Sequence, residues 1–138
     1  MNKTFNLIFQ ALLISGLLFA FGCKKDKDKN EPVPANIETL GSASITDNSA
    51  ILKGKIVKIS NPPQTERGFF YSSTNQNPTA VNGSTNLKVV DAEVTVGEYS
   101  ATASALTPNT TYYWCAYSKA GDKYEYGSVK NFKTKTGS

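Results

Sequence analysis

Apolar and polar residues alternate along several short stretches in the C-terminal part of this chain. Over residues 50–57, apolar residues and glycine occupy every second position, and lysines fall between them. In a strand, this spacing places one set of side chains on one face, here Ala50, Leu52, Gly54 and Ile56. Further strands are predicted over 65–72, 98–103, 110–118 and 126–134, where threonine and aromatic residues recur.

Turn-forming residues separate these stretches. They are Asp47-Asn48, Asn61-Pro62-Pro63, Asn82-Gly83, Pro108-Asn109 and Gly121-Asp122. No stretch after residue 35 shows a sustained period of 3.6, so no helix is predicted there. Short strands at this spacing predict an all-β, antiparallel β-sandwich of about seven strands, formed by one domain over residues 36–138.

The N-terminal region has a different pattern. A short start containing Lys3 precedes an almost wholly apolar run over residues 7–21, and small residues lie next to Cys23. This layout predicts a signal peptide over residues 1–22, cut directly before Cys23. An ordinary secretory peptide and a retained membrane span are the alternatives. The first does not need a cysteine after the cut, and the second needs about 20 apolar residues, a longer run than 7–21 with its interruptions at Gln10 and Ser15.

The segment that follows, residues 23–35, begins at Cys23 and continues through mixed charges to Pro32-Val33-Pro34. It offers no apolar face to bury, so it is predicted to be a solvated tether. A role in export to the outer surface or in binding anionic lipid is the alternative. Lysines and acids nearly balance in the segment, which favours the spacer.

The N-terminal layout resembles bacterial lipoprotein signals, although Ala20 stands where the usual motif has leucine. The resemblance implies acylation of Cys23 and a lipid anchor in the outer membrane of a Gram-negative cell. Several acyl chains would hold the protein on that membrane stably, because each buried methylene contributes about 0.8 kcal/mol. The protein is then expected either at the cell surface or on the periplasmic side of the outer membrane.

The run Leu106-Thr107-Pro108-Asn109-Thr110-Thr111-Tyr112 resembles the turn into strand F of fibronectin type III domains. Shorter matches to such domains in bacterial lipoproteins are Gly68-Phe69-Phe70-Tyr71, Ala116-Tyr117, Tyr126-Gly127 and Phe132 before Thr134. The resemblance implies a fibronectin type III-like sandwich in which the Tyr112 hydroxyl bonds back to the preceding turn. Strand B lacks the tryptophan often found in that family, and Trp114 is expected to fill its volume.

If Tyr112 points inward, alternation directs Trp114 and Ala116 inward, and Tyr113, Cys115 and Tyr117 outward. Cys115 then has no partner within the chain once Cys23 is acylated. We expect it to be a small side chain on a half-covered face. An intermolecular disulfide under oxidising conditions is the alternative hypothesis.

Catalytic chemistry is poorly represented. The chain contains no histidine, which is the commonest general base and metal ligand, and no G-x-S-x-G sequence. Asp91 and Glu93 lie two residues apart but lack the oxygen-rich loop that calcium needs. We therefore expect no enzymatic activity, no metal and no cofactor. Lysines are spread along the chain and Arg67 is its single arginine, so no nucleic-acid partner is expected.

Aromatic residues provide the candidate binding surface. Phe70 is predicted to face outward beside Tyr113 and Tyr117, and Tyr124 and Tyr126 extend the row. Exposed aromatic rings can stack on sugars or anchor a protein, although they can equally be cross-strand pairs that stabilise a solvated sheet.

Two functions fit the whole sequence. In the first, the domain is a non-catalytic binding or adhesion module that recognises an extracellular glycan or protein, through the aromatic face or through the loops at one end. In the second, it is a structural accessory subunit that packs onto a larger complex of the cell envelope. The lipid anchor makes the membrane itself a partner in both.

Overall fold

The computed structural model describes residues 33–89 and 94–138, all of which belong to the compact unit Pro32–Ser138. The predicted signal peptide, Cys23, most of the tether, Asp91 and Glu93 lie outside the described residues. The described residues form eight strands, which are β1 (Asn36–Ala43), β2 (Ala50–Lys58), β3 (Glu66–Ser72), β4 (Thr85–Val89), β5 (Gly97–Ala103), β6 (Thr111–Ala120), β7 (Lys123–Tyr126) and β8 (Lys130–Lys133). Among the described residues, no helix is long and apolar enough to cross a membrane.

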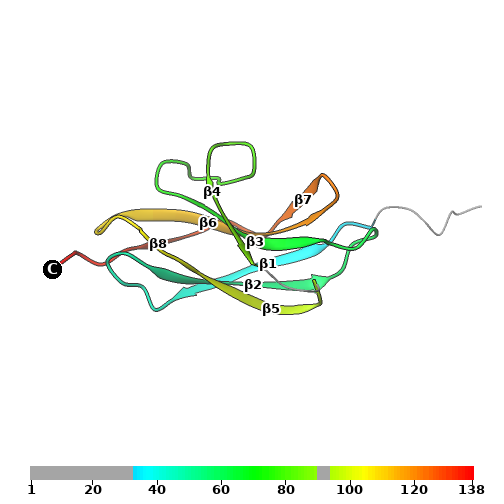
Figure 1. The fold of residues 1–138 in the computed structure, drawn as a ribbon, viewed down its shortest axis with the longest axis horizontal. Helices are drawn as coiled ribbons and strands as arrows, with labels where there is room; N and C mark the ends of the chain where they lie inside the picture. Colours follow the sequence, from blue (N-terminus) through cyan, green and yellow to red (C-terminus); the bar gives the residue numbers. More distant parts are fainter. Residues whose placement is uncertain (1–32, 90–93) are drawn as a thin grey trace, which may run out of the picture. The chain divides into compact units, whose positions relative to one another are not determined.

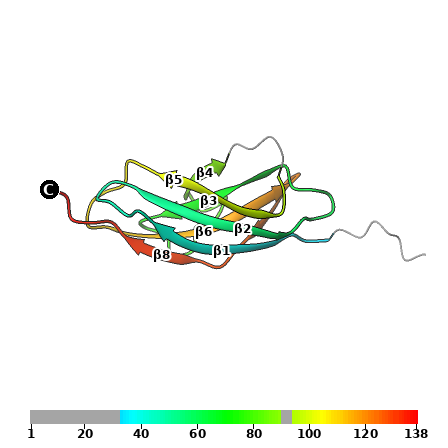
Figure 2. The ribbon, with the colours of Figure 1, turned by 90° about the horizontal axis from the view of Figure 1, so that it is seen from below.

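The strands form two antiparallel sheets. One has the order β1-β2-β5, and the other has the order β4-β3-β6-β7 with β8 also paired to β6. Figure 1 shows the two sheets as stacked layers, and Figure 2 shows β2 between β1 and β5. The predicted all-β, antiparallel sandwich is therefore confirmed.

The alternation in residues 50–57 is confirmed in β2, where Ala50, Leu52, Gly54 and Ile56 are buried. These side chains face the inner side of the other sheet and contribute to one main core. That core contains Ile37, Ala50, Leu52, Ile56, Phe69, Tyr99, Ala103, Leu106, Tyr112, Trp114, Ala116 and Phe132. Burial of apolar surface at about 25 cal/mol per Å² is the dominant force that holds the two sheets together.

Tyr112 forms the predicted corner. It is 7% exposed, and its hydroxyl accepts a hydrogen bond of 2.9 Å from the backbone N–H of Thr107. Its ring stacks on Phe132 at 5.7 Å. Trp114 is also fully buried, and its ring lies edge-on to Phe69 with a centroid distance of 5.7 Å.

Two predicted turns have the backbone conformation that their residues favour. Asn109 has a φ of 53° before β6, and Gly121 has a φ of 58° between β6 and β7. Positive φ is accessible to glycine and, at low cost, to asparagine. The second turn allows Ala120 to pair with Lys123, so that β6 and β7 form a hairpin.

The prediction of one strand over 126–134 is wrong, because the chain bends between two strands that pair with different parts of β6. β7 pairs with residues 117–120, and β8 pairs with residues 111–114. Gly127 lies at the bend, where its N–H donates to the carbonyl of Ala116 at 2.9 Å. A Cβ at this position would lie 2.5 Å from Thr39 Oγ1, so only glycine fits against β1.

Candidate ligand-binding site

The residues predicted to form an aromatic surface lie on the outer face of the five-stranded sheet, as expected from their alternation. The expectation that they are exposed is wrong for Phe70 and Tyr117, which are 3% and 0% exposed. Together with Cys115 they form a second buried cluster, which we call the outer cluster. Tyr113 and Tyr124 are half-buried, and only Tyr126 among the five keeps an exposed side chain.

The outer cluster is buried because the connection between β3 and β4, residues 73–84, folds over it. Pro78 in this connection is fully buried, and its carbonyl accepts a hydrogen bond from the Cys115 thiol at 3.2 Å. The N–H of Ala80 donates to the Tyr126 hydroxyl at 3.3 Å. Tyr124 closes the other side, with its ring 6.0 Å from Phe70 and 5.7 Å from Tyr117.

Cys115 is therefore more deeply buried than predicted, since we expected it to lie on a half-covered face. Burial raises the pKa of its thiol to about 11, so the thiol is protonated and poorly nucleophilic at neutral pH. The hypothesis of an intermolecular disulfide needs an accessible thiol and does not fit this position.

Polar groups close one edge of the outer cluster. The Tyr117 hydroxyl donates to Glu66 Oε1 at 2.6 Å and lies 3.0 Å from Asn86 Oδ1, and Glu66 also pairs with Lys88 at 3.0 Å. Burial alone would raise the pKa of Glu66, but the hydrogen bond from Tyr117 and the charge of Lys88 outweigh it and lower that pKa. The outer cluster is thus a satisfied, packed unit, and its central rings offer no surface for stacking.

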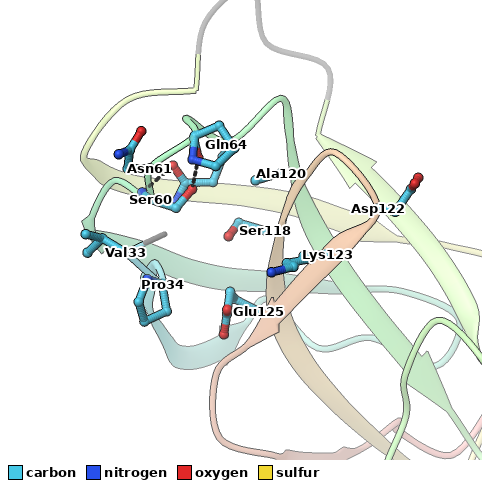
Figure 3. A pocket seen from close by; sticks show the side chains of 11 residues that line it. Val33, Pro34, Ser60, Asn61, Gln64, Ser118, Ala120, Asp122, Lys123 and Glu125 are labelled. Carbon is cyan, nitrogen blue, oxygen red and sulfur yellow. Dashed lines mark hydrogen bonds between the residues drawn. The ribbon is translucent and has the colours of Figure 1, made fainter. Parts of the chain in front are cut away.

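A candidate site lies elsewhere in this domain, at the end of the sandwich where the chain enters at Val33. A cavity of about 510 Å³ lies there, and we call it the interlayer cavity. It lies within the range of about 300–1,000 Å³ typical of small-ligand sites. Figure 3 shows its lining, which comes from Val33, Pro34, the β2–β3 loop (Ser60, Asn61, Pro62, Gln64), β6 (Ser118, Ala120) and the β6–β7 hairpin (Asp122, Lys123, Glu125).

Backbone pairing and one buried amide hold the loop side of the interlayer cavity in place. Val33 and Asn61 exchange two backbone hydrogen bonds, of 3.1 and 2.9 Å. The Gln64 side chain is buried, accepts from the N–H of Ser60 at 3.1 Å and donates to the carbonyl of Lys58 at 3.4 Å. This wall is therefore formed in advance of any ligand.

Ser118 lies at the inner end of the interlayer cavity. Its side chain is fully buried, and within the described part of the chain its hydroxyl has no hydrogen-bond partner. In Figure 3 the hydroxyl is directed into the space between Val33 and the hairpin. Arg67 lies opposite Ser118 on β3, but its guanidinium donates to the carbonyl of Thr95 at 3.3 Å and covers the Tyr99 ring.

Burial of the unpartnered Ser118 hydroxyl is unfavourable for a purely structural residue. A buried polar group without a hydrogen-bond partner lowers the stability of the fold by about 1–3 kcal/mol relative to a satisfied one. Each group of this kind in a folded protein therefore needs an explanation. The Nε1 of Trp114 is the other such atom in the described part of the chain, but it lies inside the main core and not beside a cavity.

Sequence reasoning missed both the interlayer cavity and Ser118. A signal was present: Ser118 continues the inward series of Tyr112, Trp114 and Ala116, where an apolar residue is the norm.

Among the described residues, no three acidic, cysteine or histidine side chains come together as metal ligands.

No known family model and no curated protein matches this chain. Among solved structures, it is similar to the sensor domain of the anti-sigma factor RsgI4 from Pseudobacteroides cellulosolvens. One such structure is 21% identical with a TM-score of 0.54, covering 75% of this chain and 96% of the sensor chain. A second, determined in solution, is 21% identical with a TM-score of 0.51, covering 75% and 76%. At this identity the likeness establishes the β-sandwich fold alone.

Proposed function

We propose that this chain is a lipoprotein anchored to the outer membrane through Cys23, and that its sandwich is a non-catalytic module that binds an extracellular ligand. The observation that supports binding most directly is the interlayer cavity with the unpartnered Ser118 hydroxyl at its inner end. A ligand that supplied the missing hydrogen bond would relieve the unfavourable burial of that hydroxyl.

Of the two routes considered from the sequence, the loops at one end are better supported than the aromatic face. Phe70 and Tyr117 are buried, which leaves Tyr113, Tyr124 and Tyr126 as the rings that a glycan or a protein could touch. The interlayer cavity, in contrast, is concave, mostly preformed and lined by both apolar and polar groups, as small-molecule sites usually are.

A comparison of the molecules that co-purify with two forms of the full chain tests this function. Ala120→Phe places a ring in the interlayer cavity, whereas Thr102→Phe places the same ring at an exposed position of β5, in the other sheet. We expect mass spectrometry to find a compound that is retained by the wild type and by Thr102→Phe and is lost from Ala120→Phe. Equal retention by all three forms would contradict a ligand site in the cavity. Recovery only in crosslinked complexes with other envelope proteins would instead favour the accessory-subunit role.

A further inference from the structure

The chemistry of the interlayer cavity restricts the kind of ligand that it can hold. Its inner end presents Ser118, and a hydroxyl can donate one hydrogen bond and accept others. The partner that it lacks can therefore be an N–H group or a carbonyl. A peptide unit carries both groups side by side, so it satisfies the hydroxyl in either orientation.

The apolar part of the lining is aliphatic. Val33, Pro34, Pro62 and Ala120 supply it, and no aromatic ring lies among the described residues that line the cavity. Sugar sites commonly use flat rings as stacking surfaces. In this domain the buried aromatic rings pack in the main core and the outer cluster, and the rings that remain accessible on the outer face, Tyr113, Tyr124 and Tyr126, do not line this cavity. The interlayer cavity therefore matches short aliphatic side chains better than it matches a saccharide.

Opposite charges lie beside each other on the hairpin. Lys123 and Glu125 are two residues apart on β7, so they share a face, and they pair with Ala120 and Ser118, which line the cavity. Figure 3 shows Asp122 pointing away from the cavity, while Lys123 and Glu125 flank Ser118. A ligand with a carboxylate and an ammonium group can pair with both charges, whereas a neutral polyol pairs with neither.

We propose that the interlayer cavity binds a short peptide with free termini and small aliphatic side chains, an inference that rests on the proposed function. A peptide unit of the ligand bonds to Ser118, its side chains contact the aliphatic wall, and its carboxylate and ammonium groups pair with Lys123 and Glu125. The site thus recognises peptide fragments and not folded proteins.

Calorimetric titration of the full chain in a neutral detergent tests this proposal with three probes. They are trialanine, trialanine blocked by N-acetylation and C-amidation, and maltotriose. The variants are Ser118→Ala, with Ser104→Ala as its control, and Lys123→Gln, with Lys133→Gln as its control. Ser104 is exposed and follows β5 at the opposite end of the sandwich, and Lys133 is exposed on β8.

We expect trialanine to bind to the wild type and to both control variants. Ser118→Ala should weaken this binding about tenfold, the effect of losing one hydrogen bond. Blocking the termini should weaken it by a similar factor in the wild type, and the blocked peptide should not distinguish Lys123→Gln from the wild type.

Binding of maltotriose in place of trialanine, with a loss in Ser118→Ala, would overturn the peptide inference and leave the binding function intact. Binding of trialanine that Ser118→Ala does not change would also overturn the inference, because the peptide would then bind elsewhere. Failure of all three probes to bind the wild type would overturn the peptide inference. The binding function itself would then be judged separately, by whether a compound co-purifies with the wild type and is lost from Ala120→Phe.

Discussion

At the scale of single residues, the Tyr112 hydroxyl gives the sharpest test of the corner between β5 and β6. Tyr112→Phe removes the acceptor of the Thr107 N–H and keeps the ring packed against Phe132. We expect the free energy of unfolding to fall by about 1 kcal/mol in denaturant titrations. Tyr113→Phe is the matched control, since it removes a phenol oxygen from the adjacent, half-buried position. Equal effects of both variants would contradict the corner.

Ser118 should behave in the opposite way. Ser118→Ala removes a buried hydroxyl that has no partner in the described part of the chain, so we expect the free energy of unfolding to rise by about 1 kcal/mol. Ser104→Ala, at an exposed position, should change it very little. A loss of stability in Ser118→Ala, measured without ligand, would show that the hydroxyl has a structural partner.

Glu66 makes the stability of the domain depend on pH. Its pKa is lowered in the folded state, so its ionised form contributes to stability above the unfolded pKa, and this contribution disappears as the pH falls through the folded value. As the pH falls below 4.5, the ordinary pKa of a glutamate, the wild type should therefore lose more stability than Glu66→Gln. Tyr117→Phe should reduce the same difference, because it removes the hydrogen bond to the carboxylate. Parallel pH profiles for the wild type and Glu66→Gln would refute this role.

At the scale of elements, the strands with clear alternation could be predicted from sequence, and β2 is the best example. β1 and β4 were not predicted as strands. β4 pairs at the edge of its sheet and exposes Thr85, Asn86 and Lys88. Its sequence therefore lacks the clear alternation of apolar and polar residues that predicts a strand. The division between β7 and β8 depends on contact of Gly127 with Thr39, which lies far away in sequence. Such tertiary contacts leave no local pattern.

The β3–β4 connection shows the same limit for the candidate site. Alternation placed Phe70 and Tyr117 on the correct face, but nothing local to them shows that residues 73–84 cover that face. The cover depends on contacts such as the one between Pro78 and Cys115. Ser118 is different, because a polar residue in an inward series could have been recognised from sequence as an exception.

Opening of this connection can be measured through Cys115. We expect alkylation of Cys115, followed by mass spectrometry of its peptide, to be slow in the folded protein, because the thiol is buried and its pKa is raised. Tyr126→Phe removes the hydrogen bond from Ala80 and should speed the reaction severalfold. Tyr124→Phe, which leaves that bond in place, is the control. Rapid alkylation of the wild type would show that the connection does not cover the outer cluster.

At the scale of the whole molecule, the account combines a proposed lipid anchor with a sandwich that has its cavity at the end where the chain enters. Cys23→Ser tests the anchor. We expect this variant to leave the membrane fraction or to remain uncut, since acylation at residue 23 supplies the proposed attachment. Fractionation followed by gel electrophoresis reports both outcomes. Membrane association and mobility identical to those of the wild type would refute the anchor.

The central claim concerns the interlayer cavity, and an experimental structure of the chain purified from its own membrane tests it most directly. The account predicts a bound, non-protein molecule in the cavity, with a nitrogen or oxygen about 2.7–3.2 Å from Ser118 Oγ. A Ser118 hydroxyl bonded to an atom of the protein itself, above a cavity that holds only water, would contradict it.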